Sequence, residues 1–175
     1  MTFGRNFILF LLIVAPVFVV APTASIAEDK PVMTAPVDLK LLEQGWRVMC
    51  QATDATRNNL QCKAVFEAFS ESNQRLLAAE ILSEGNKRTL LITTPLGTAL
   101  AKPLEVKIDQ VAIPSSGYEQ CQVAGCLTRL SISDTTLALL RKGKMLTVAF
   151  DVGDKKVTLP ISLAGLGLAL SKADL

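Results

Sequence analysis

Four cysteines are the residues of this sequence whose type and spacing suggest chemistry. Cys50 and Cys62 lie twelve positions apart, and Cys121 and Cys126 lie five apart. Such pairs can form a redox-active dithiol, bind a metal ion or crosslink two strands. Oxidoreductases prefer Cys-X-X-Cys at a helix N-terminus, which lowers the pKa of the attacking thiol. The wider spacing between Cys121 and Cys126, flanked by strand-like segments, favours a structural disulfide.

The composition excludes much other chemistry. Histidine is absent from all 175 residues, so the sequence lacks a Ser-His-Asp or Cys-His arrangement and a histidine-ligated metal. The carboxylates show no spacing that singles out an acid–base pair, and we interpret them as solvated strand residues. We therefore predict a non-enzymatic protein with no catalytic residues, no metal site and no cofactor.

The N-terminus indicates export. Arg5 precedes an apolar run from Phe7 to Val20, and small residues lead to a predicted cleavage site after Ala27, as in a secretory signal peptide. An uncleaved membrane anchor is the alternative, but Pro16 interrupts the run, which is shorter than the roughly 20 residues that span a bilayer. We predict a periplasmic, secreted or cell-surface protein with no transmembrane span after cleavage.

The predicted mature chain is nearly neutral and contains all four cysteines. Loss of Arg5 leaves 17 basic residues against 16 acidic ones, which argues against a nucleic-acid-binding protein. Exported chains with an even number of cysteines usually pair them. We predict a signal peptide at 1–27, a flexible N-terminal arm at 28–44 and one domain at 45–175.

Period-two alternation of apolar and polar residues predicts strands through most of that domain. They are expected at 46–51, 60–69, 75–83, 88–93, 104–109, 118–122, 126–132, 146–152 and 155–161. A two-residue turn at Gly153-Asp154 would place Val152 opposite Lys155 and the apolar residues of both last strands on one face. A register shifted by one residue would separate them.

Helix signals are few. Asp134 is the predicted N-cap of a short helix over 137–142, which ends at Gly143. After the last strand, Leu163, Leu166 and Leu170 share one helical face, which predicts a C-terminal helical segment packed on the sheet.

Many short strands with little helix indicate an all-β fold, a β-sandwich. An outer-membrane barrel is disfavoured because the mature chain has few aromatic residues for its girdles.

The sequence resembles the invasion-associated locus B family of exported bacterial proteins. The resemblance rests on features in the family's order from position 45 to the C-terminus: Trp46-Arg47-Val48-Met49-Cys50, Cys62, Thr94-Pro95-Leu96-Gly97, Cys121 with Gly125-Cys126, and the segment 159–166. It implies an immunoglobulin-like β-sandwich in the periplasm or at the outer membrane. The family is named for host-cell invasion and carries no catalytic motif.

Four cysteines allow three pairings. We favour Cys50 with Cys62 and Cys121 with Cys126, because each pair flanks a turn-rich segment between adjacent strands. The alternative, Cys50 with Cys121, would imitate the inter-sheet disulfide of antibody domains.

Candidate contact residues are Arg141, Lys142 and Lys144, a basic group at a predicted turn that could meet an anionic glycan or lipopolysaccharide. The predicted function is that of a disulfide-stabilised binding protein of the bacterial envelope, with an envelope or host protein as partner and a possible contribution to host-cell invasion or virulence. A periplasmic chaperone-like accessory is the alternative. A thiol-disulfide enzyme is disfavoured by the cysteine spacing.

Overall fold

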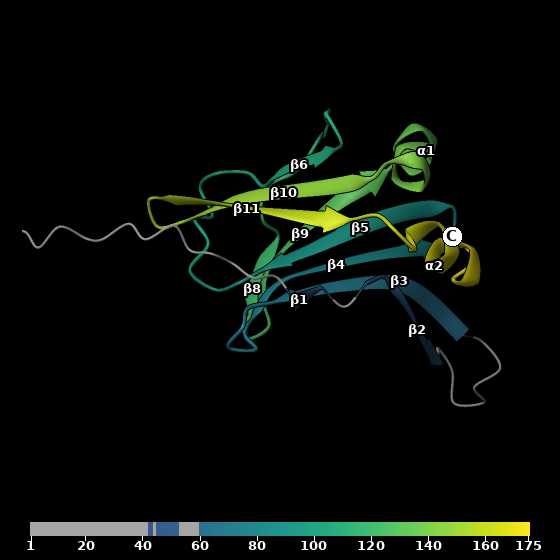
Figure 1. The fold of residues 1–175 in the computed structure, drawn as a ribbon, viewed down its shortest axis with the longest axis horizontal. Helices are drawn as coiled ribbons and strands as arrows, with labels where there is room; N and C mark the ends of the chain where they lie inside the picture. The colour runs from purple at the N-terminus through teal and green to yellow at the C-terminus, as the bar shows by residue number, and fades with distance from the viewer. Residues whose placement is uncertain (1–41, 44, 53–59) are drawn as a thin grey trace, which may run out of the picture. The chain divides into compact units, whose positions relative to one another are not determined.

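The computed structural model describes residues 42–43, 45–52 and 60–175, all within one compact unit, Asp38–Leu175. The described chain forms two antiparallel sheets (Figure 1). The larger sheet contains β1 (Leu42–Glu43), β2 (Arg47–Ala52), β3 (Leu60–Phe69), β4 (Arg75–Glu84), β5 (Lys87–Thr94), β9 (Gly125–Ile132) and β8 (Gln120–Gln122). The smaller sheet contains β11 (Lys155–Ser162), β10 (Met145–Val152), β6 (Glu105–Ile108) and β7 (Val111–Ile113).

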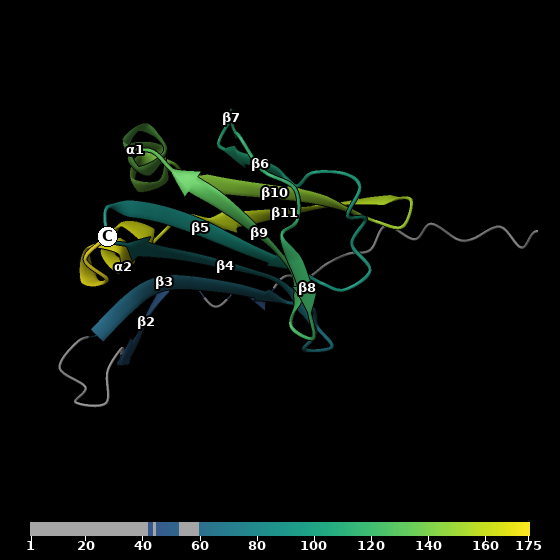
Figure 2. The ribbon, with the colours of Figure 1, turned by 180° about the vertical axis from the view of Figure 1, so that it is seen from behind.

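The two sheets pack face to face and enclose one hydrophobic core (Figures 1 and 2). Alternate residues of each strand point inward, as period-two patterning requires. Because β6 reads apolar then charged, Val106 and Ile108 are buried while Glu105 and Lys107 face solvent. The largest inward side chains on the strands are Phe66, Leu77, Ile81, Ile92, Ile108, Leu146, Leu159 and Ile161. The fold is therefore the predicted all-β sandwich.

Two short helices lie at the same end of the sandwich, and the turn between β10 and β11 lies at the opposite end (Figures 1 and 2). α1 (Asp134–Lys142) buries Leu137 and Leu140. α2 (Leu166–Lys172) buries Leu166, Ala169 and Leu170 and contacts α1, β2 and β3. The predicted C-terminal helical segment is thus present and packs against the larger sheet.

Trp46 is partly buried and packs against the core at the start of β2. Glu43 lies opposite Ala68 and Arg47 opposite Val65, so the pairing register with β3 differs by one residue between β1 and β2. Gly45 adopts a φ of +54°, a conformation that glycine takes without steric cost. The Trp46 ring lies 5.5 Å from that of Phe66.

The β10–β11 hairpin has the predicted register. Val152 lies opposite Lys155, Phe150 opposite Val157 and Leu146 opposite Ile161. Gly153 takes a φ of +57°, which suits a two-residue hairpin turn. The apolar residues of both strands consequently share the core face.

Several sequence-based details were wrong or missed. The N-cap of α1 is Ser133, whose hydroxyl accepts from the amide of Thr136 at 3.1 Å, and Asp134 begins the helix. Because Ser and Asp are both strong N-cap residues, neighbouring candidates are hard to separate. The strand β7 was not predicted, and β1 falls within the predicted arm at 28–44.

The predicted signal peptide and the rest of that arm lie outside the described residues. Within the described part of the chain, neither helix has the length and apolar character needed to cross a membrane.

Candidate functional site

The cysteines form two disulfides between directly opposed residues of antiparallel strands. Cys50 lies opposite Cys62 in the β2–β3 ladder, and Cys121 lies opposite Cys126 in β8–β9. This is the local pairing that the sequence favours, and the crossed pairing of Cys50 with Cys121 does not occur. No described cysteine is free, so this part of the chain offers no thiolate nucleophile.

The second disulfide closes a rigid turn. Cys126 is buried at 2% exposure, whereas Cys121 is exposed. Gly125 adopts a φ of +129°, and a side chain at this position would collide with the main-chain oxygen of Thr94. The backbone of the β8–β9 turn therefore packs tightly against the end of β5.

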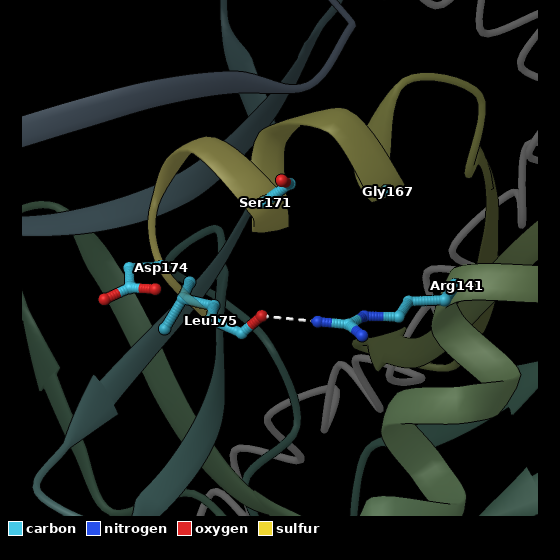
Figure 3. A pocket seen from close by; sticks show the side chains of 5 residues that line it. All are labelled: Arg141, Gly167, Ser171, Asp174 and Leu175. Atoms are coloured by element: carbon cyan, nitrogen blue, oxygen red, sulfur yellow. Dashed lines mark hydrogen bonds between the residues drawn. The ribbon is translucent and has the colours of Figure 1, made fainter.

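The predicted basic group lies at the end of α1, and its three members have different environments. The guanidinium of Arg141 donates to the main-chain oxygen of Leu175 at 2.6 Å (Figure 3). Lys142 and Lys144 are exposed, and neither forms an ion pair with a described residue. The amide of Lys144 donates to the carboxylate of Asp109 at 3.1 Å. Arg141 is thus engaged by the chain itself, and the two lysines remain available to an anion.

A hollow of about 380 Å³ lies between α1 and the segment after α2. Arg141 reaches across it to Leu175, while the side chain of Asp174 lies on the far side of Leu175 (Figure 3). Ser171 and Gly167 complete the lining. Because the guanidinium already has a carbonyl partner, we interpret this contact as one that secures the C-terminal segment against α1.

Ion pairs cover the outer face of the larger sheet. The carboxylate of Glu67 accepts from Arg47 and, at 3.2 Å, from Arg75. Partial burial would raise the pKa of Glu67, but hydrogen bonds and charges from the two arginines outweigh it and lower that pKa. Lys63 and Glu80 form a second pair at 2.6 Å. These carboxylates therefore act as ion-pair partners.

Other carboxylates also have structural roles. Glu105 pairs with Lys156 at 2.6 Å, and this hydrogen bond lowers the pKa of Glu105. Asp151 pairs with Lys102 at 3.0 Å. Among the described residues, no three His, Cys, Asp or Glu side chains are grouped so as to bind a metal ion.

A buried cluster of hydroxyl groups was not predicted from the sequence. Thr94 and Thr98 are both less than 10% exposed; their hydroxyl oxygens lie 3.1 Å apart, and Thr98 donates to the main-chain oxygen of Pro95 at 2.7 Å. Burial raises the pKa of Tyr118. The cluster fixes the chain where it leaves β5, at the Thr94-Pro95-Leu96-Gly97 motif.

Comparison with known proteins identifies the family of this chain. A sequence model of the Invasion associated locus B (IalB) protein family matches residues 46–174. The chain belongs to the invasion-associated locus B family. The matched region begins at Trp46 and includes both disulfides.

Two curated relatives come from Brucella abortus, one from strain 2308 and one from biovar 1 strain 9-941, and both are described as invasion protein B homologs. Each is 30% identical over 132 residues, which cover 74% of this chain and 75% of the relative. The crystal structure of invasion associated protein B from Bartonella henselae matches with a TM-score of 0.65, at 22% identity, over 76% of this chain and 95% of that chain. The similarity to the Bartonella henselae structure shows a shared fold.

Proposed function

We propose that this member of the invasion-associated locus B family is an exported, non-enzymatic binding protein of the bacterial envelope. One observation carries the proposal: all four cysteines are paired in two disulfides between adjacent strands. Disulfides persist in the periplasm, at the cell surface and in secreted proteins, and are rare in the cytosol. The signal-like segment at 1–27 supports the same location.

A non-enzymatic role is supported by the chemistry of the side chains. The sequence has no histidine, and its described cysteines are oxidised. Glu67, Glu80 and Glu105 are held in ion pairs. The Brucella relatives are named for invasion, and we extend to this chain the hypothesis of a contribution to host-cell invasion.

Export is tested in the native bacterium by fractionation combined with mass measurement of the intact protein. We expect a periplasmic or extracellular protein that begins at Glu28 and resists thiol alkylation until it is reduced. An uncleaved, cytosolic or alkylatable protein would contradict the proposal.

A polyanion is one proposed partner, bound through Lys142 and Lys144. We expect purified protein to bind lipopolysaccharide with salt-dependent affinity, because surface charge interactions are screened by salt. The double variant Lys142→Glu and Lys144→Glu should bind at least about ten-fold more weakly, and the control Lys87→Glu, in the β4–β5 hairpin, should bind normally. Equal losses in both would show that these two lysines form no specific site.

The absence of thiol-exchange activity is tested with Cys126→Ser, which leaves Cys121 as a free thiol. A dithiol enzyme altered in this way retains mixed disulfides with its clients. We expect none above the level seen with Cys62→Ser, which frees Cys50. A specific set of clients trapped through Cys121 would instead establish an exchange enzyme.

A further inference from the structure

A second hollow, of about 440 Å³, lies at one end of the larger sheet, beside two turns and the segment that follows β5. The β3–β4 turn contributes Asn73 and Gln74, the β8–β9 turn contributes Val123 and Ala124, and the segment after β5 contributes Pro95 and Leu96. Phe69, Glu67 and Arg75 also line it. These three segments are far apart in the sequence, and neither the family match nor the relatives' names assign a role to this place.

Two of the three walls of this hollow are held by their own bonds. In the β3–β4 turn, the amide of Ser70 donates to the oxygen of Gln74 at 2.8 Å, and the amide of Asn73 donates to the oxygen of Ser70 at 2.9 Å. The β8–β9 turn is closed by the disulfide between Cys121 and Cys126. Rigid walls reduce the ordering cost of binding.

Arg75 joins two of the walls. Its guanidinium donates to the oxygen of Ala124 at 2.6 Å and to the carboxylate of Glu67 at 3.2 Å. The positive charge of Arg75 therefore faces the negative charge of Glu67 within the hollow. Because no charge there lacks a partner, the lining suits an uncharged ligand.

The remaining lining groups suit a ligand with many hydroxyls. The side-chain amides of Asn73 and Gln74 are exposed and form no hydrogen bond with a described residue. Each amide offers two donors and one acceptor, which can meet neighbouring hydroxyls. Phe69 and Pro95 add apolar surfaces of the kind that pack against the C–H face of a sugar ring.

From this arrangement we propose that the hollow bounded by Asn73, Arg75 and Val123 is a binding site for a neutral saccharide of one or two rings. Its volume lies at the lower end of the range for small-molecule sites, about 300–1,000 Å³. The proposal names a ligand class for the binding function proposed above and rests on it. The site is separate from Lys142 and Lys144, because Lys142 ends α1, which follows the last residue of β9, whereas the hollow adjoins Gly125 at the first residue of β9.

The test titrates the purified, oxidised full chain with glucose, galactose, mannose, N-acetylglucosamine and their β-linked disaccharides, followed by amide NMR. We expect at least one sugar to shift the side-chain amide signals of Asn73 and Gln74, with a dissociation constant on the order of 1 mM, as befits a small ligand in an open site. Asn73→Gly removes the amide and tolerates the positive φ of 60° at this position. It should weaken binding at least about ten-fold.

Asn86→Gly is the matched control, because Asn86 is an exposed turn asparagine between β4 and β5; it should bind normally. Phe69→Leu keeps an apolar side chain but removes the ring, and should also weaken binding. The absence of any shift, or shifts that persist in Asn73→Gly, would overturn the saccharide site. Because the assay uses pure components, such a failure leaves the export and polyanion experiments as separate tests of the proposed function.

Discussion

Trp46 donates its indole N–H to the main-chain oxygen of Ser162, 116 positions later in the sequence, at 2.9 Å. Trp46 directly precedes β2 at one edge of the larger sheet, and Ser162 ends β11 at one edge of the smaller sheet. The bond therefore joins the two sheets on one side of the sandwich. Gly45, directly before the tryptophan, takes a φ of +54°, a conformation that glycine adopts without steric cost.

Trp46→Phe should lower the free energy of unfolding by about 1–2 kcal/mol, because it removes the donor while an aromatic ring still packs on Phe66. Urea unfolding followed by circular dichroism measures the difference. Trp46→Leu, which also removes the aromatic contact, should cost more. Equal losses in the two variants would mean that the ring contact contributes nothing measurable.

The two disulfides should contribute unequally to stability. They span 12 and 5 positions, and the loop-entropy model assigns roughly 3 kcal/mol to the longer loop and roughly 2 kcal/mol to the shorter one. Replacing Cys50 and Cys62 by alanine should therefore lower the free energy of unfolding more than replacing Cys121 and Cys126. Chemical denaturation measures both.

Reduced wild-type protein is the control for this pair of variants, since it loses the crosslinks but keeps every side-chain atom of Cys126 in the core. The reduced wild type lacks both disulfides, whereas each double variant keeps one, so the reduced wild type should be the least stable of the three. If both double variants unfold at the wild-type urea concentration, the disulfides are not structural.

The period-two pattern of apolar residues, together with a recognisable turn, predicted most of the strands. The hairpin around Gly153-Asp154 was predictable because the turn fixes the register and only one register keeps Phe150 and Val157 in the core. The strands β1 and β7 were missed because two or three residues are too few to show a period. β1 also depends on pairing with β3, which is distant in the sequence, whereas β7 forms a tight hairpin with the preceding β6.

The candidate sites were predictable to different degrees. The disulfides followed from strand adjacency, which is a local property. The engagement of Arg141 by Leu175 was not predictable, because it depends on how α2 packs against α1. The hollow near Asn73 was not predictable either, because its three walls meet only when β4, β5 and β9 form one sheet.

The stability of the protein should fall in acid partly through Glu67. Its folded-state pKa is lowered by Arg47 and Arg75, so the carboxylate contributes stability above its unfolded-state pKa, and this contribution is lost as pH falls through the lower folded-state pKa. Between about pH 5 and pH 3, the wild type should lose more free energy of unfolding than Glu67→Gln. Arg75→Gln removes one cause of the lowered pKa, so its loss of free energy of unfolding over this pH range should lie between those of the wild type and Glu67→Gln. A steeper acid loss in Glu67→Gln would contradict the assignment.

Two buried threonines should respond in opposite ways to valine. The hydroxyl of Thr128 is fully buried and has no hydrogen-bond partner among the described residues, so Thr128→Val should leave stability unchanged or raise it. Thr94→Val loses contacts with the hydroxyl of Thr98 at 3.1 Å and the oxygen of Cys126 at 3.4 Å, and should cost about 1 kcal/mol. Thermal unfolding compares them, and a clear loss in Thr128→Val would reveal a partner for its hydroxyl.

Gly125 should tolerate alanine less well than Gly153. A Cβ added to Gly125 would lie 2.2 Å from the oxygen of Thr94, far inside contact distance, and its φ of +129° is one that side chains rarely adopt. Because the disulfide holds the turn in place, Gly125→Ala should lower the free energy of unfolding by about 3 kcal/mol or more. Gly153→Ala is the matched control: its φ is also positive, but nothing lies within 4 Å of the added Cβ, so it should cost roughly 1 kcal/mol. Urea unfolding of both variants, with the disulfides intact, gives the difference. Similar losses would show that the β8–β9 turn can move away from β5 at little cost.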